Sequence, residues 1–449
     1  MLRAAYVLAM VLCLLTAPVM GAAQDWKALT RYDKNAVKTQ LTDRFVKYAQ
    51  IDTQSNPSVA YVPSSKGQKV FAKQLAKELK KYGAQHVKVS ENSLVTADIA
   101  ATSKNPAPAV AFLAHLDTAP EISAHAVKPR VIKHYDGKDI VLDAARQLTL
   151  NSYTAPKLTA AHGHDLIVAN GGTSLGADDK AGIAVIMTLV QYLYDHPEIA
   201  HGPIKIVFTP DESTGAGMAK LNPADLGVQY AYTVSGGDTG ELMTENFNAK
   251  SFVITFTGYR AVRPGLAQNS AFADNVLMAS DFHTLLPRYQ RPETTTDKRG
   301  FIYVNDISTQ GDTTTVRGII RAFSDEETAQ LVSTVQNAFN TVKSMHARAK
   351  GATLAFRDEY KNMKAALPPA MLQLTKTAMQ AEEITPKEVS LRGSTDGAVL
   401  SAAGIPAPDI FAGIYNTHTA LEYVDADVME SSLRTLIRLL TLWETQKAL

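Results

Sequence analysis

The stretch Ala109-Val110-Ala111-Phe112-Leu113-Ala114, followed directly by His115-Leu116-Asp117, decides the fold of this 449-residue chain. An unbroken apolar run of this length is typical of a strand that is buried on both faces of a sheet. His115 is the first polar residue after the run. Because open α/β sheets bind ligands at the carboxyl ends of their strands, the stretch predicts a buried central strand with a functional group at its end.

Two further apolar runs continue this pattern downstream. Residues 204–209 and 230–234 are predicted as buried strands that end in polar loops, and residues 180–194 as a helix that precedes them. Strands that alternate with helices predict an α/β domain with a mostly parallel central sheet. Apolar periodicity also predicts helices at residues 41–49, 69–82 and 428–443.

The sequence changes character from about residue 250. Residues 251–257 alternate between apolar and polar side chains, which is typical of a sheet with one solvated face, and residues 315–323 are another candidate strand. Ser324 and Glu327 have the spacing of a capping box in front of an amphipathic helix. These elements predict a smaller α+β domain at residues 250–354, inserted into the α/β domain.

The N-terminus has the pattern of an export signal. Arg3 precedes a short apolar stretch, and Gly21-Ala22-Ala23 offers the small residues of a cleavage site. We therefore expect residues 1–23 to be a signal peptide and the mature protein to be exported, either periplasmic or secreted. No other apolar run approaches the roughly 18 residues that a membrane span needs, so no membrane partner is expected after signal removal.

Composition narrows the chemistry further. Cys13 is the only cysteine, so a mature chain without the signal would have none, and a metal site could use only His, Asp and Glu. The net charge is +1 with 20% charged residues, which gives no electrostatic reason to expect a nucleic-acid partner.

Three polar segments carry the candidate chemistry. His115 and Asp117 lie two residues apart, so the Asp117 carboxylate could hold the second ring nitrogen of a metal-binding His115. Asp178 stands where a loop opens into a helix, although an N-cap aspartate has the same pattern. Glu212 follows a buried strand and is a candidate general base, although a solvated loop would explain it equally. Together these groups suit peptide hydrolysis assisted by zinc.

In this order and spacing, the segments resemble peptidase T, a group of aminotripeptidases within the two-zinc metallopeptidases that include aminoacylase and carboxypeptidase G. The resemblance spans nearly the whole mature chain, up to a segment around His418. Its other matching segments are Leu41-Thr42-Asp43-Arg44-Phe45, Ile51-Asp52-Thr53-Gln54-Ser55, Glu245-Asn246-Phe247-Asn248-Ala249 and Arg392-Gly393-Ser394-Thr395-Asp396-Gly397.

The resemblance implies a role for each candidate residue. His115 and His418 would each bind one zinc, and Asp178 would bridge the two ions. Glu212 would be the base that activates water, and Asp117 would orient His115. The reaction implied for such a site is removal of a residue from a short peptide, above all a tripeptide.

The same resemblance assigns the domains and the substrate contacts. Residues 24–249 and 355–449 would form the catalytic domain, and residues 250–354 would form a lid that also makes a homodimer. Arg321 and Arg392 would hold polar or carboxylate groups of the peptide, which suits the fork of a guanidinium group.

Three residues depart from the family pattern. Ser213 and Ser235 stand where the family has carboxylate ligands. Arg263 stands where the family has a histidine that stabilises the oxyanion, and we expect Arg263 to contact the substrate and to be able to stabilise an oxyanion itself. Serine is a neutral and weak zinc ligand, so each metal position would keep only two protein ligands. Losing two carboxylates and gaining one guanidinium makes the site more positive, which repels dications. We therefore expect zero or one zinc ion rather than two.

Three functions remain compatible with this pattern. The first is an exported homologue that binds short peptides but hydrolyses them weakly or not at all. The second is an active zinc aminopeptidase with a rebuilt single-zinc site that uses His115, Asp178 and His418, with Glu212 as base; Asp238 is a less favoured substitute ligand. The third is a structural role through the interface of the inserted domain.

Overall fold

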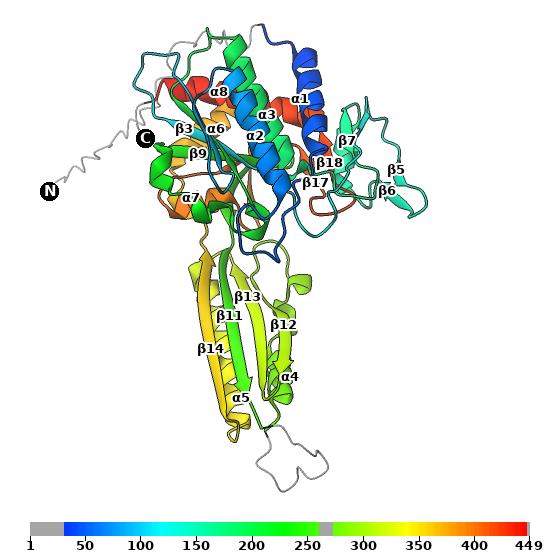
Figure 1. The fold of residues 1–449 in the computed structure, drawn as a ribbon, viewed down its shortest axis with the longest axis vertical. Helices are drawn as coiled ribbons and strands as arrows, with labels where there is room; N and C mark the ends of the chain where they lie inside the picture. The colour runs from blue at the N-terminus through cyan, green and yellow to red at the C-terminus, as the bar shows by residue number, and fades with distance from the viewer. Residues whose placement is uncertain (1–30, 260–272, 447–449) are drawn as a thin grey trace, which may run out of the picture.

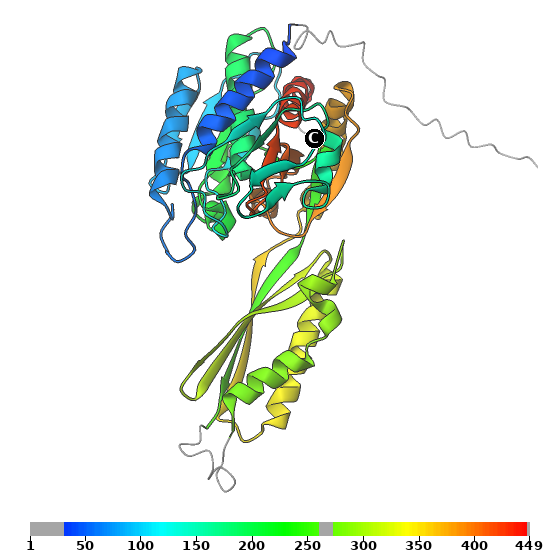
Figure 2. The same ribbon diagram turned by 90° about the vertical axis from the view of Figure 1, so that its right-hand side faces the viewer.

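A computed structural model describes residues 31–259 and 273–446 of the chain. The predicted signal peptide and Arg263 both lie outside these described residues. Figures 1 and 2 show two units, a large one that contains both ends of the described chain and a smaller, elongated one joined to it by a narrow junction.

The large unit is built on an eight-stranded sheet whose core strands are parallel. Strand β3 lies between β8 and β9 and runs parallel to both, β16 runs parallel to β9, and β15 runs parallel to β10. The order across the sheet is β1 (Gln85–Val89), β2 (Val95–Ile99), β8 (Ile204–Thr209), β3 (Val110–His115), β9 (Tyr230–Gly236), β16 (Asp409–Phe411), β10 (Glu241–Asn246) and β15 (Lys387–Leu391).

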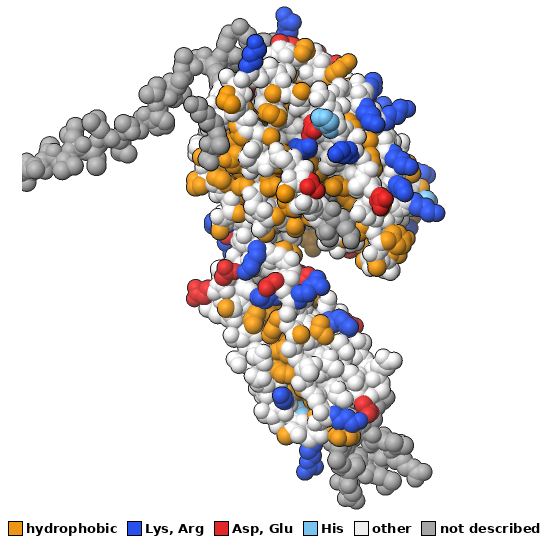
Figure 3. Space-filling model, turned by 60° about the vertical axis from the view of Figure 1, so that its left-hand side comes forward, with side chains coloured by type: hydrophobic (Ala, Val, Ile, Leu, Met, Phe, Trp, Pro, Cys, Tyr) orange, Lys and Arg blue, Asp and Glu red, His pale blue; other side chains and the backbone are white. Residues whose placement is uncertain are grey.

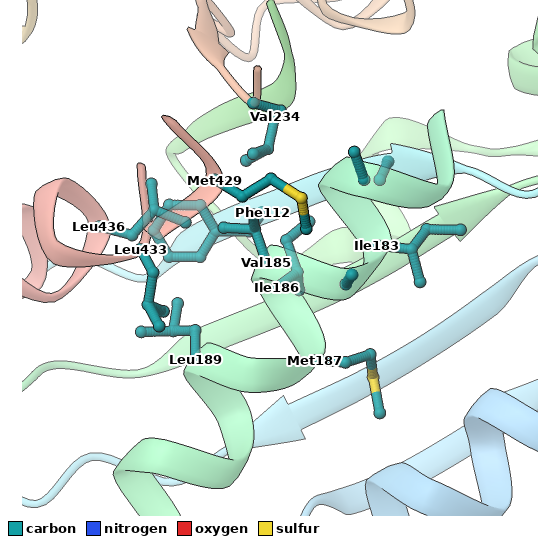
Figure 4. Close-up of a cluster of buried hydrophobic side chains, with 14 of the residues drawn as sticks. Phe112, Ile183, Val185, Ile186, Met187, Leu189, Val234, Met429, Leu433 and Leu436 are labelled. Atoms are coloured by element: carbon teal, nitrogen blue, oxygen red, sulfur yellow. The ribbon is translucent and has the colours of Figure 1, made fainter. Parts of the chain in front are cut away.

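Strand β3 is buried on both faces, as its sequence predicts. Phe112 belongs to a core cluster that includes residues of α3 and α8 (Figure 4), whereas Leu113 belongs to a second cluster on the opposite face with Leu400 of α7. Burial of this strand therefore fixes the centre of the sheet. The helices of the large unit are α1 (Lys34–Ala49), α2 (Lys66–Lys81), α3 (Ala177–Asp195), α6 (Pro369–Ala381), α7 (Asp396–Ala402) and α8 (Ala426–Glu444).

A group of short strands beside the main sheet was not predicted. These strands form a four-stranded sheet and a separate hairpin, which Figure 1 shows at the side of the large unit. They are too short to give a clear apolar period. The four-stranded sheet has the order β17 (Ile414–Tyr415), β18 (Tyr423–Asp425), β7 (Leu166–Val168) and β4 (Arg130–Ile132), and the hairpin joins β5 (Ile140–Asp143) to β6 (Leu148–Leu150).

The smaller unit is an antiparallel sheet covered on one face by two helices (Figure 2). The Ser324 side chain caps α5 as predicted, but the Glu327 carboxylate accepts a hydrogen bond from the Gly300 backbone N–H instead of completing a capping box. The sheet order is β12 (Phe301–Gln310), β13 (Thr313–Ala322), β11 (Asn248–Thr257) and β14 (Gly351–Tyr360), and the helices are α4 (Asn275–Leu285) and α5 (Asp325–Met345).

The arrangement confirms the predicted fold class, an α/β unit with a mostly parallel sheet and an inserted smaller unit with its own antiparallel sheet. Strand β14 runs to Tyr360, past the predicted boundary at residue 354. Within the described residues, no helix has both the length and the apolar content that would let it cross a membrane.

Candidate functional site

The candidate site lies where the central parallel strands end. His115 is the last residue of β3 and pairs in register with Thr209, the last residue of β8. Glu212 follows β8, and Ser235 lies near the end of β9. Three separate segments therefore bring their polar side chains to one edge of the sheet, which is the edge that the sequence predicts.

Asp178 occupies the centre of this site. Asp178 does not cap the helix, because the backbone N–H of Gly182 donates to the carboxylate of the neighbouring Asp179 at 3.2 Å, while the Asp178 carboxylate faces the two histidines. Its carboxylate is approached from two sides: His115 Nε2 lies 2.9 Å from Oδ1, and His418 Nε2 lies 3.3 Å from Oδ2. The Ser235 hydroxyl donates a hydrogen bond of 3.3 Å to Oδ1.

These contacts shift the titration of all three groups. Burial would raise the pKa of Asp178, but hydrogen bonds from His115 and His418 outweigh burial and lower it. Burial would lower the pKa of His115, but hydrogen bonds with Asp117 and Asp178 raise it well above its usual range. The hydrogen bond to Asp178 also raises the pKa of His418 to about 9. Asp178 is thus a carboxylate flanked by two protonated imidazoles.

Asp117 fixes the turn that follows β8. Its fully buried carboxylate accepts hydrogen bonds from the backbone N–H groups of Glu212, at 2.9 Å, and Ser213, at 3.2 Å. His115 Nδ1 lies 3.0 Å from the Asp117 carbonyl oxygen and 3.3 Å from its carboxylate. Asp117 therefore holds both the imidazole and the turn that carries the candidate base.

Glu212 does not lie in a solvated loop. Its side chain is 22% exposed and its carboxylate reaches to 3.9 Å from His115 Nε2. Burial raises the pKa of Glu212 to about 8, despite the opposing charge of His115. A carboxyl group with a pKa near neutrality, placed beside Asp178 and its histidines, can take up or release a proton at this site.

The sequence profile of the peptidase family M20/M25/M40 matches residues 173–442. This chain belongs to that family. It is 38% identical to the peptidase T of a Geobacillus species (strain WCH70) over 414 residues, which are 92% of this chain and all of the relative. It is 40% identical to the peptidase T of Parabacteroides distasonis over 407 residues, which are 90% of this chain and 98% of the relative. The predicted resemblance to peptidase T is confirmed.

Several solved structures share the fold at low sequence identity. The aminopeptidase PepT of Bacillus cereus superposes with a TM-score of 0.69 at 19% identity, covering 90% of this chain and 98% of the other. A tripeptidase of Staphylococcus aureus gives a TM-score of 0.71 at 18% identity, covering 91% and 99%. A dinuclear metal-binding M20 peptidase of Bacillus subtilis gives 0.63 at 13% identity, covering 91% and 98%.

The M20 family leads us to expect bound metal ions. The side chains around Asp178 can be compared with the ligands that such ions need. The two imidazoles face different oxygens of the carboxylate, which is how two metal positions share a bridging ligand. Each position then has one imidazole and the shared Asp178, and the additional oxygen beside Oδ1 is the neutral hydroxyl of Ser235. Catalytic zinc sites use three protein ligands. The residues present therefore do not fit a resident pair of zinc ions.

Asp238 does not supply the missing carboxylate. It forms an ion pair with Lys157, and its backbone N–H donates to Glu241 at 3.0 Å. Among the residues that the structure describes, three ligand atoms from His, Asp or Glu lie within 4.8 Å of one another only at His164, Asp425 and Asp427, a group that does not include Asp178.

Three carboxyl groups near Asp178 and its histidines had no role assigned from the sequence. The fully buried Glu422 accepts hydrogen bonds from the backbone N–H groups of Gly176, at 2.7 Å, and Asp178, at 3.1 Å, and so holds the Asp178 loop. Asp409 accepts from the backbone of Ser235 at 2.9 Å, and Glu121 lies 3.4 Å from His418 Nδ1. In the sequence, the signal that could have revealed such a residue is a single charged side chain within an apolar run, as at Asp409.

The two described arginines of the predicted peptide contacts make internal bonds. Arg321 Nη1 donates to the carbonyls of Ile320, at 3.0 Å, and Lys250, at 3.3 Å, and its guanidinium lies over the Tyr360 ring. Arg392 bonds to the loop before β12. Both therefore lie at the junction of the two units. Burial raises the pKa of Tyr360, whose ring lies beside Arg321, and the candidate site is near enough for the charge of Glu212 to raise the pKa of Tyr360 further.

Proposed function

We propose that this M20 protein binds short peptides and hydrolyses them weakly or not at all. The observation that carries the proposal is the set of side chains that contact the Asp178 carboxylate, namely two imidazoles and one hydroxyl. Metal ligation is the step that zinc peptidases cannot replace, because the ion both polarises the carbonyl and lowers the pKa of water.

The preserved framework supports binding as the remaining activity. Asp117 still holds the turn of Glu212 and Ser213, and Glu422 still holds the loop of Asp178. The backbone of Ser213 is thus held by Asp117, and the backbone of Ser235 is held in the same way by Asp409, which supports a site whose altered positions differ from the family in their side chains. Such a site keeps its shape while losing its affinity for a dication.

A single zinc held by His115, Asp178 and His418 receives no support from the geometry. In the described parts of the chain, these three side chains do not bring their ligand atoms within 4.8 Å of one another. One ion would have to draw the two imidazoles together from opposite oxygens of the carboxylate. We therefore favour the peptide-binding homologue over the single-zinc enzyme.

The ligand, the location and the assembly belong to the same proposal. Relatives named peptidase T and tripeptidase suggest a short peptide, of about three residues, as ligand. Export to the periplasm or outside the cell is supported by the pattern of residues 1–23. A homodimer through the smaller unit is proposed from the family resemblance.

Metal content, peptide binding and turnover should be measured on one preparation of the purified protein. We expect less than one zinc per chain, calorimetric binding of a tripeptide, and little or no product by chromatography. Two tightly held zinc ions with rapid turnover would overturn the proposal. Absence of both binding and turnover would leave the structural role through the smaller unit. Glu212→Gln serves as control, because turnover that persists in this variant comes from a contaminating peptidase.

A further inference from the structure

The chain crosses between the two units at two places, after β10 and after β14. At this end of the smaller sheet, Ala249 pairs with Arg321 and with Tyr360, and Arg321 pairs with Phe301. These four residues form one row across the four strands. The segment 295–299, which directly precedes that row, therefore lies at the junction with the large unit.

Arg392 reaches across the junction from the large unit to this segment. Its Nη1 donates to the backbone carbonyls of Asp297, at 2.8 Å, and Arg299, at 2.9 Å, and its Nη2 donates to Thr295 Oγ1 at 3.0 Å. The guanidinium also lies over the ring of Phe247, with 5.1 Å from its carbon to the ring centroid. The Arg392 guanidinium thus makes three hydrogen bonds and one ring contact at the junction of the two units.

Glu245, near the end of β10, also contacts segment 295–299. Its carboxylate forms an ion pair with Lys298, accepts a hydrogen bond from Ser390 at 3.0 Å, and lies 3.5 Å from Lys364 Nζ. Glu245 is 8% exposed, whereas the Lys298 side chain is 59% exposed. Hydrogen bonds from Lys298 and Ser390 outweigh burial and lower the pKa of Glu245, so the carboxylate is charged.

We infer that Arg392 and Glu245 are positioning residues that form a clamp on segment 295–299 and set the orientation of the smaller unit. The name clamp refers here to these two side chains and that segment. Charged side chains of both signs gather where the two units meet (Figure 3). Because the clamp lies close to both chain crossings, a small displacement there becomes a large displacement at the far end of the elongated unit.

The chemistry of the clamp favours a reversible contact over a fixed core. It consists of charge-assisted hydrogen bonds at a partly exposed junction, which water can replace when they break. Arg392 binds carbonyl groups through its planar fork, a geometry that a lysine ammonium does not reproduce. In this arrangement the Arg392 guanidinium is engaged by segment 295–299. It can bind a different carbonyl or carboxylate group only after these hydrogen bonds break.

Distances between the two units test this inference directly. Spin labels are placed at Val70→Cys on α2 and Met345→Cys at the far end of α5, both 61% exposed, in a Cys13→Ser background. In the full chain, we expect a narrow distance distribution for the parent and a wider, shifted distribution for Arg392→Ala. Arg392→Lys should fall between them, and Glu245→Gln should also widen the distribution because Lys298 loses its charged partner.

Arg357→Ala is the matched control, because Arg357 pairs with Glu359 of the same strand at 3.0 Å and its side chain is 79% exposed. Its distribution should equal that of the parent. Thermal melting of every variant checks that each unit stays folded. Parent-like distributions in folded Arg392→Lys and Glu245→Gln would overturn the inference, and so would equal widening in Arg357→Ala.

Discussion

Histidines and aspartates gather at two places in the described part of the large unit, and the proposed M20 site, the group around Asp178, is one of them. Around Asp178, two imidazoles approach opposite oxygens of one carboxylate. Around His164, the ligand atoms of His164, Asp425 and Asp427 lie within 4.8 Å of one another, which is a closer grouping than at Asp178. Distance alone would select the second group as the metal site.

The cations that balance the carboxylates differ between the two places. In the second group, Lys38 Nζ lies 2.9 Å from Asp427 and 3.3 Å from Asp165, and Lys133 lies 2.9 Å from Asp165. His164 Nδ1 lies 2.7 Å from Asp425. Protein cations therefore already satisfy these carboxylates, and the group ties α1 to the start of α8. A lysine ammonium group has no lone pair for a metal, whereas the imidazoles that balance Asp178 can lose their protons and become ligands.

The strongest test of this difference between the two groups is to place acidic side chains at residues 213 and 235 of the proposed M20 site. Ser213→Glu combined with Ser235→Asp should raise zinc content from below one to about two ions per chain and produce tripeptide hydrolysis, because each metal position regains a third ligand. Metal analysis and a peptide assay measure both effects. The neutral variant Ser213→Gln with Ser235→Asn is the control and should bind no additional zinc.

Unchanged zinc content in the acidic double variant would contradict this expectation. It would mean that the backbone around Asp178 no longer places residues 213 and 235 toward two ions. The backbone N–H groups of Ser213 and Ser235 donate to the buried carboxylates of Asp117 and Asp409, and these bonds argue that it does.

The long apolar elements could be predicted from the sequence because burial alone decides them. Strand β3 is buried at every residue, and α3 and α8 are long enough to show their period. The strands β4, β7, β17 and β18 were missed, since two or three residues cannot display a period. Their position depends on pairing between segments far apart in the chain.

The candidate site was predicted in its residue types but not in its contacts. The order of His115, Asp178, Glu212 and His418 was visible because each follows a predicted element or matches a family segment. The bonds of Arg392 to segment 295–299 could not be predicted, because they join loops almost a hundred residues apart through backbone carbonyls. No local pattern in the sequence encodes such a contact.

We expect a smaller effect, on stability, when Lys38 of the second group loses its charge. Lys38→Met leaves Asp427 without its 2.9 Å partner, so the free energy of unfolding should fall by about 2 kcal/mol. Added zinc should recover part of this loss in the variant and have no effect on the parent at this group. Urea unfolding with and without zinc measures both quantities. An unchanged free energy of unfolding would mean that Lys38 does not balance this group.

The smallest expected effect concerns the pH dependence of the same group. The hydrogen bond to Asp425 raises the pKa of His164 above its ordinary value of about 6.5. A raised pKa stabilises the fold fully below the ordinary value, and this contribution fades as the pH rises through the raised value. His164→Asn should therefore cost more stability at about pH 5.5 than at about pH 9. Urea unfolding at both pH values measures the difference, and His125→Asn, at a side chain that is 78% exposed, is the control. An equal cost at both pH values would show that the imidazole bonds to Asp425 as a neutral group, so that Lys38 and Lys133 alone balance the charge of this group.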